Sequence, residues 1–91
     1  MRIRQTGIFK RRAKKLHSDE KTALDEAIQA IVDDPTIGQI KTGDLAGVQV
    51  YKYKHNGQQY LLAYRLIEAE ALLILLALGM HENFYRDLKR Q

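Results

Sequence analysis

The middle of the chain alternates between apolar and polar residues as the strands of a half-buried sheet do. Residues 48–55 alternate strictly and predict a first strand. The Asn56-Gly57 pair that follows is the strongest short signal for a two-residue hairpin turn. Residues 59–67 are therefore expected to return as a second strand. The apolar run 71–78, which a glycine ends, predicts a third strand buried on both faces.

Two amphipathic helices are predicted before this sheet. From Ile8 onward, apolar residues recur at helical spacing, and cationic residues cover the rest of the surface. Residues 19–33 repeat the apolar spacing, with Ser18 as the expected N-cap. Pro35 disfavours helical geometry at the residue before it, so the second helix should end there. The two helices are expected to form a hairpin that packs on the sheet.

The rest of the chain completes a small α+β fold. Residues 2–6 alternate weakly and predict an edge strand, residues 36–47 predict a loop that Leu45 anchors in the core, and residues 80–91 predict a short helix. The 91 residues are expected to make a single domain, 1–91. An antiparallel sheet with one buried and one solvated face is the usual arrangement for such a set of elements.

The solvated face of this sheet would gather cations. If the tyrosines of both strands lie under the helices, Lys52, Lys54 and Arg65 emerge together on the opposite side. Those tyrosines are Tyr51, Tyr53, Tyr60 and Tyr64. Lysines on a solvated sheet face, or guarding an edge strand, are also ordinary in proteins that have no site there. The alternation by itself leaves both alternatives open.

Charge is unevenly distributed along the chain. The net charge is +4, and residues 1–16 hold seven basic side chains and no acidic one. A basic surface of this kind attracts polyanions, of which nucleic acid is the commonest. A solvated helix face in a protein of high pI explains the same pattern about equally well.

Composition limits the classes of protein to be considered. The chain has no cysteine, so it can form neither a disulfide nor a thiolate metal site. The apolar run at residues 71–80 is too short to cross a bilayer, and no signal-peptide core follows the charged N-terminus. We expect a cytoplasmic protein that does not associate with membranes and needs no metal or other cofactor.

His81 is the histidine whose position indicates a function. It follows the last predicted strand, and Tyr85 lies four residues further on, so a helix would place both on one side. A lone histidine is more often structural, and His17 and His55 are expected to be loop residues without a role.

Motifs along nearly the whole chain resemble the RelE/ParE superfamily of small bacterial toxins from type II toxin-antitoxin modules. They are Phe9-Lys10-x-x-Ala13-Lys14-Lys15-Leu16, Asp33-Asp34-Pro35, Gly38, Leu45-Ala46-Gly47, Tyr51-Lys52-Tyr53-Lys54, Tyr60-Leu61-Leu62-Ala63-Tyr64-Arg65, Gly79, and Asn83-Phe84-Tyr85-Arg86-Asp87-Leu88-Lys89-Arg90. No single motif is highly specific, but their order and spacing together are. The resemblance implies a β-α-α-β-β-β-α fold in which the helical hairpin packs on a curved antiparallel sheet.

The resemblance also implies a reaction. RelE-like toxins cleave mRNA in the ribosomal A site and leave a 2′,3′-cyclic phosphate, a metal-independent endoribonuclease activity that inhibits translation. Lys52 and Lys54 match the strand lysines of the family, as base or proton shuttle, and Arg65 is expected to stabilise charge on the phosphate. His81 is the expected general acid, because imidazole titrates near neutral pH. Tyr85 resembles the aromatic residue that stacks on a base or orients the nucleophile.

Partners follow from the same resemblance. A cognate antitoxin with a flexible, acidic segment is expected to bind the cationic helix together with Lys52, Lys54 and Arg65. Contacts with mRNA and the ribosome are expected from basic residues of the first and last helices, namely Lys10, Arg11, Arg12, Lys14, Lys15 and Arg86.

One departure keeps a second branch of the superfamily open. Many RNA-cleaving relatives have an arginine where this chain has Leu61, and Arg65, further along the same face, is the candidate to replace it. If Arg65 cannot do so, a ParE-like toxin that inhibits DNA gyrase without its own catalysis becomes the better interpretation. A third class, a non-toxic RNA-binding or scaffold protein, fits the charge but not the length of the resemblance.

Overall fold

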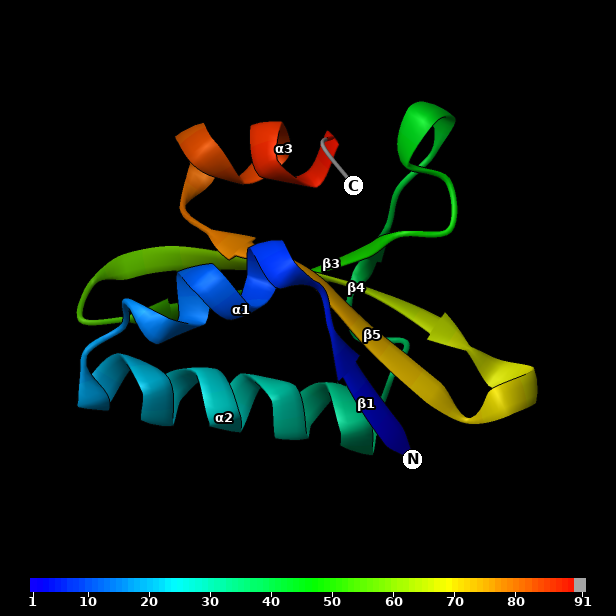
Figure 1. The fold of residues 1–91 in the computed structure, drawn as a ribbon, viewed down its shortest axis with the longest axis horizontal. Coiled ribbons are helices and arrows are strands. Elements are labelled where there is room, and N and C mark those ends of the chain that lie inside the picture. The colour runs from blue at the N-terminus through cyan, green and yellow to red at the C-terminus, as the bar shows by residue number, and fades with distance from the viewer. Residues whose placement is uncertain (90–91) are drawn as a thin grey trace.

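The computed structural model describes residues 1–89, and for His81, Glu82, Asn83 and Asp87 it describes the backbone alone. The elements in chain order are β1 (Arg2–Gln5), α1 (Gly7–Lys14), α2 (Ser18–Asp33), β2 (Gln39–Ile40), β3 (Gln49–His55), β4 (Gln58–Ile67), β5 (Leu72–Gly79) and α3 (His81–Lys89). Two short 3-10 turns lie at Gly43–Leu45 and Glu68–Glu70. The predicted α+β class is confirmed, with three helices packed on one sheet (Figure 1).

The sheet is mixed, not antiparallel throughout. Its five strands have the order β1-β5-β4-β3-β2, in which β3, β4 and β5 form the predicted antiparallel meander. The edge strand β1 pairs with β5 in parallel, which corrects the all-antiparallel expectation. Parallel neighbours need a long crossover between them. The helical hairpin and the first two strands of the meander supply it, and the alternation within the meander carries no signal for this pairing.

The loop predicted between α2 and β3 contains a strand. Gln39 and Ile40 form β2 and pair with Val50 and Gln49 at the outer edge of β3. A two-residue strand carries no period, so the sequence pattern could not reveal it. Leu45 is half-buried against the core, as expected of an anchor.

Local signals fixed the turns and most helix ends. Asn56 and Gly57 both have positive φ, 51° and 76°, as the predicted turn requires, and His55 pairs with Gln58 around it. The N-cap of α2 is His17 and not Ser18, because the Glu20 carboxylate accepts a hydrogen bond from the His17 backbone N–H at 2.9 Å.

One core lies between the sheet and the helical hairpin. The buried side chains there are Phe9, Leu24, Ala27, Ile31, Leu62, Tyr64, Leu73, Leu75 and Leu78, and Tyr51 and Tyr53 pack against them. The tyrosine face is therefore the one under the helices, so the condition for Lys52 and Lys54 to emerge on the opposite side is met. The Tyr64 hydroxyl donates to the Pro35 carbonyl at 2.6 Å and accepts from the Gly38 N–H at 3.0 Å. This pair of bonds fastens the chain after α2 to the sheet.

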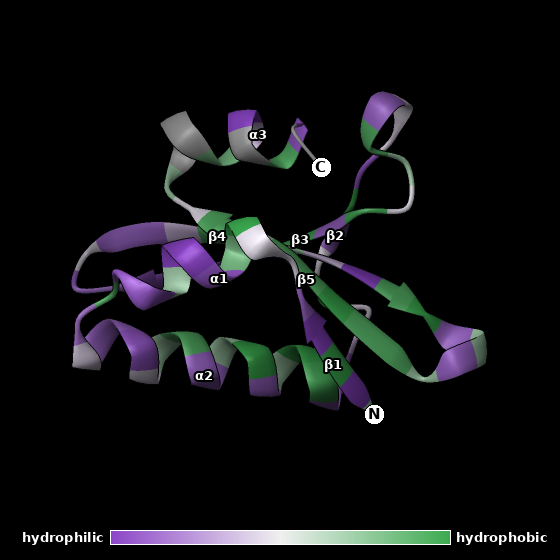
Figure 2. Ribbon diagram, in the orientation of Figure 1, coloured by the Kyte–Doolittle hydropathy of each residue, from purple (hydrophilic) through white to green (hydrophobic). Residues whose placement is uncertain are grey.

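A second core covers much of the face that was expected to be solvated. Phe84 and Leu88 of α3 pack on Val48, Val50, Leu61, Ala63 and Ala77. In Figure 1, α3 and α2 lie on opposite sides of the sheet. The apolar residues that share this face with the lysines need cover, and the last helix provides it. In Figure 2, β5 is hydrophobic along its length, while the β3–β4 hairpin is hydrophilic towards its tip.

Candidate functional site

Lys52 and Lys54 lie where this second face emerges from beneath α3. Both side chains are exposed on β3. In the register of the sheet, Lys52 pairs with Leu61, and Leu61 pairs with Gly79, the last residue of β5. Two strand spacings separate the Cα atoms of Lys52 and Gly79, which is about 10 Å. Lys52, Leu61 and Gly79 therefore form one row across the sheet, and α3 begins two residues after Gly79.

Two predicted site residues, His81 and Tyr85, lie on α3. The backbone of His81 opens the helix, two residues after Gly79, and its side chain lies outside the described part of the chain. Tyr85 is half-buried beside Phe84, with ring centroids 5.0 Å apart in an edge-to-face arrangement. The ammonium of Lys41, which follows β2, stands 5.9 Å from the centre of the Tyr85 ring. Tyr85 thus faces the segment after β2.

Arg65 does not lie with the two lysines. It shares their face, but Tyr64 pairs with Gln49, so Arg65 stands next to Val48, at the beginning of β3. Lys52 is four residues further along that strand, or about 13 Å away at the usual rise per residue. The three cations therefore share one face, as expected, but along the strands Arg65 is not adjacent to the two lysines. Alternation fixes the face on which a residue lies, whereas the register fixes its position along the strand.

Arg12 of α1 takes a place that the sequence did not indicate. Its guanidinium lies 3.8 Å from the point where a β-carbon on Gly79 would stand, and the Phe84 Cα lies 3.9 Å from the same point. Because Gly79 pairs with Leu61, this point is on the lysine-bearing face. Arg12 therefore reaches the first turns of α3 from the opposite side to Lys52. The predicted RNA contacts Lys10, Arg11, Lys14, Lys15 and Arg86 are exposed, while Arg12 is half-buried.

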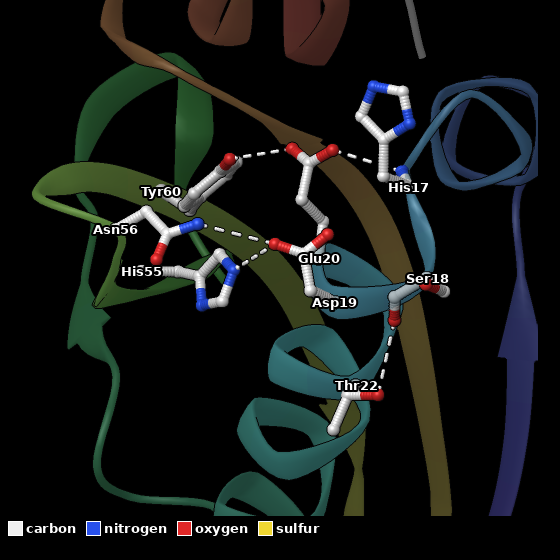
Figure 3. A network of polar contacts seen from close by, with 8 residues as sticks. All are labelled: His17, Ser18, Asp19, Glu20, Thr22, His55, Asn56 and Tyr60. Atoms are coloured by element: carbon white, nitrogen blue, oxygen red, sulfur yellow. Dashed lines mark hydrogen bonds and ion pairs between the residues drawn. The ribbon is translucent and has the colours of Figure 1, made fainter.

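A polar network fastens the tip of the β3–β4 hairpin to the beginning of α2 (Figure 3). The His55 imidazole lies 2.8 Å from the Asp19 carboxylate, and the Asn56 amide donates to the same oxygen at 3.3 Å. The Tyr60 hydroxyl donates to Glu20 at 2.7 Å. His55, which was expected to have no role, therefore joins two elements. We call the contacts of Asp19 and Glu20 with His55, Asn56 and Tyr60 the hairpin latch.

The latch shifts the acid-base behaviour of its members. The hydrogen bond from His55 is the largest cause of a lowered pKa at Asp19. The His17 backbone N–H, followed by the Tyr60 hydroxyl, lowers the pKa of Glu20. The hydrogen bond to Glu20, with burial second, raises the pKa of Tyr60 to about 12. Each shift favours the protonation state that makes the hydrogen bond.

The described residues show neither a cluster of metal ligands nor a membrane-spanning helix. No three histidine, aspartate or glutamate side chains among them converge as metal ligands would. None of the helices there combines the length and the apolar character needed to cross a membrane.

Comparisons with known proteins agree with this fold. A family described as the ParE-like toxin of type II bacterial toxin-antitoxin systems matches residues 3–89. The fold is similar to a chain of the intact RelBE toxin-antitoxin complex of E. coli, with a TM-score of 0.73 and 18% identity over 89% of this chain and 96% of that one. It is also similar to a chain of the RelBE2 toxin-antitoxin complex of Mycobacterium tuberculosis, with a TM-score of 0.75 and 22% identity over 88% and 96% of the two chains. The isolated RelE toxin of E. coli matches with a TM-score of 0.69 and 20% identity over 89% and 84%. A search of curated proteins gives no significant match.

Proposed function

The chain belongs to the ParE-like toxins of type II bacterial toxin-antitoxin systems, and on this premise we propose that it inhibits translation by cleaving mRNA in the ribosomal A site. The observation that supports the proposal is the row formed by Lys52, Leu61 and Gly79. This row brings an exposed amine to the beginning of α3, where the chain places His81. Arg12 approaches the same turns from the other side.

The proposed reaction needs a proton removed, a proton supplied and negative charge stabilised between them. The 2′-oxygen of the RNA attacks the adjacent phosphorus, the bond from phosphorus to the 5′-oxygen breaks, and a 2′,3′-cyclic phosphate and a free 5′-hydroxyl result. Lys52 takes the proton of the 2′-hydroxyl, and His81 gives a proton to the leaving 5′-oxygen. Lys54 and Arg12 stabilise the charge that develops on the phosphate. Tyr85 contacts a base near this point.

The experiment is to express the chain and map new mRNA ends. Cells should stop growing, with cleavage at defined positions within codons, and a variant carrying both Lys52→Ala and His81→Ala should do neither. Lys21→Gln is the matched control, because Lys21 is an exposed lysine of α2, away from this row. Growth arrest that persists unchanged in the double variant would exclude RNA cleavage as its cause.

Inhibition of DNA gyrase is the second candidate, and one observation favours it. The position of Arg65 deprives the lysine pair of the cation that was expected to replace an arginine at Leu61. A toxin without a complete catalytic set would act by binding its target. Induced cells would then form filaments and accumulate DNA breaks while their mRNA stays intact.

A cognate antitoxin is the proposed protein partner under either function. The exposed cations of α1 lie beside a cavity of about 420 Å³ between α1 and α2, whose apolar lining includes Phe9 and Leu24. An acidic amphipathic segment would match both the charge and the apolar lining. Co-expression with the product of the neighbouring gene tests this, because an antitoxin should restore growth and copurify with the chain.

A further inference from the structure

A second cavity lies on the α3 side of the sheet, away from the lysine row. It has a volume of about 540 Å³ and lies between the Gly43–Leu45 turn, the beginning of β3 and the end of α3. Val48, Leu76 and Leu88 contribute apolar surface, and Asp44, Arg65 and Lys89 contribute charge. We call it the Arg65 pocket. Its size is within the range of sites that hold small molecules.

The position of Arg65 in this pocket depends on a glycine. A β-carbon on Gly47 would stand 2.5 Å from a terminal nitrogen of Arg65, and Gly47 has a φ of 87°. A side chain at position 47 would therefore be strained and would also collide with the guanidinium. The turn before β3 is built in a way that leaves room for the arginine.

The cations of the pocket lack a partner within the described part of the chain. Neither the half-buried guanidinium of Arg65 nor the ammonium of Lys89 forms a hydrogen bond or ion pair with another described residue. A partly desolvated cation is unfavourable unless an anion or acceptor compensates it. An apolar wall beside the half-buried Arg65 and the exposed Lys89 is suited to a ligand with a flat apolar body and a negative group.

We propose that the Arg65 pocket binds one nucleotide of the RNA strand, beyond the bond that is cleaved. Arg65 and Lys89 hold its phosphate, and its base lies on Val48, Leu76 and Leu88. The inference rests on the proposed function and names a part of its substrate. Its support is the location of the pocket, because Arg65 shares the face of Lys52 and lies about 13 Å from it along the ladder, measured on the backbone. Lys41 and Tyr85 stand on the same side of the sheet, by the segment that leads to the pocket.

Asp44 makes the pocket selective among bases. Its carboxylate, which also lines the cavity, would repel a phosphate but can accept a hydrogen bond from an exocyclic amino group of a base. Cytosine carries such a group, and uracil has a carbonyl oxygen in its place. We therefore expect cytosine to be preferred over uracil at this position. The Asp44 carboxylate and the uracil carbonyl oxygen are both hydrogen-bond acceptors, so they repel each other and form no hydrogen bond.

Titration with cytidine 3′-monophosphate and uridine 3′-monophosphate, followed by NMR, tests the pocket directly. The wild-type chain should bind the cytidine nucleotide more tightly, with shifts at Val48 and Leu88. Arg65→Gln should weaken binding by about tenfold or more, since a charged hydrogen bond is lost, and Asp44→Asn should remove the preference for cytidine. Arg4→Gln is the matched control, because Arg4 is exposed on β1. Equal binding by wild type and Arg65→Gln would overturn the inference.

A cleavage experiment separates this inference from the proposed function. If wild type cleaves mRNA, Arg65→Gln and Asp44→Asn should change the base found at a fixed distance from the cut. An unchanged distribution in both variants would refute the pocket's role while leaving RNA cleavage in place. A chain that binds the cytidine nucleotide through Arg65 but cleaves no mRNA would instead refute the proposed function and leave a nucleotide site.

Discussion

The imidazole of His55 lies 2.8 Å from the carboxylate of Asp19, across 36 residues of sequence. This contact joins the tip of the β3–β4 hairpin to the first turn of α2. Lys52 and Lys54 are on the same hairpin, so the latch also limits where the backbone that carries them can lie. A strand pair is marginal by itself and depends on packing against a helix.

Acid should weaken the latch at Asp19. The folded state lowers the pKa of this carboxyl below its ordinary value of 3.8. A lowered pKa means that the contribution is present above the unfolded value and is lost as the pH falls through the folded one. The part of the difference in unfolding free energy between wild type and His55→Ala that comes from Asp19 should therefore shrink as the pH falls below about 4. Urea unfolding at several pH values measures it, and a difference that grows in acid would contradict the assignment.

Alkali should weaken the latch at Tyr60. Its pKa is raised to about 12 in the folded state, from the ordinary tyrosine value of 10.0. A raised pKa stabilises the fold below the unfolded value, and the contribution is lost as the pH rises through the folded one. The stability advantage of wild type over Tyr60→Phe should hold below pH 10.0 and decline towards pH 12. Tyr51→Phe, which alters a neighbouring tyrosine outside the latch, is the control.

Gly38→Ala should destabilise the fold. The added methyl carbon would stand 2.5 Å from the Tyr64 hydroxyl oxygen, and that hydroxyl also accepts from the Gly38 N–H. Separating the two groups would disturb the buried bonds of Tyr64, at a cost of about 1–3 kcal/mol. Gly7→Ala is the comparison, because the nearest atom there is the flexible end of Arg11, 3.4 Å away. Equal losses in the two variants would contradict the proposed clash.

Leu61→Arg should destabilise the protein and should not increase its activity. Restoring the arginine of RNA-cleaving relatives looks favourable from the sequence, but Leu61 is only 2% exposed and packs in the core beneath α3. A guanidinium at that position must either lose hydration or displace the helix. Thermal unfolding and the cleavage assay on the same preparation test this. A stable variant with faster cleavage would show that the site tolerates the cation.

Arg12→Gln and Arg65→Gln should affect RNA cleavage differently. The guanidinium of Arg12 is close to the beginning of α3, so its loss should slow the chemical step by about a hundredfold, as removal of one charge-stabilising group does elsewhere. Arg65→Gln should mainly change which sequences are cut. Rates at saturating ribosome complex separate the two effects, and Arg4→Gln controls for the loss of positive charge. Equal rate losses in the Arg12 and Arg4 variants would remove Arg12 from the site.

The sequence by itself determined the elements and their faces. Helical spacing, the Asn56-Gly57 turn and strict alternation are local signals, and local backbone geometry follows from them. They were enough to predict the helical hairpin, the meander, and that Lys52 and Lys54 share one face while the tyrosines share the other. The motifs also predicted the toxin family, which the family match confirmed.

The tertiary structure decided which distant residues meet. Strand register moved Arg65 away from the lysines, the close approach of α1 to Gly79 brought Arg12 to the beginning of α3, and the hairpin tip met α2 at His55. The parallel pairing of β1 and the packing of α3 on the second face were settled in the same way. These contacts join segments far apart in the chain and depend on how whole elements bury their apolar surface. No period or turn signal within one segment encodes them.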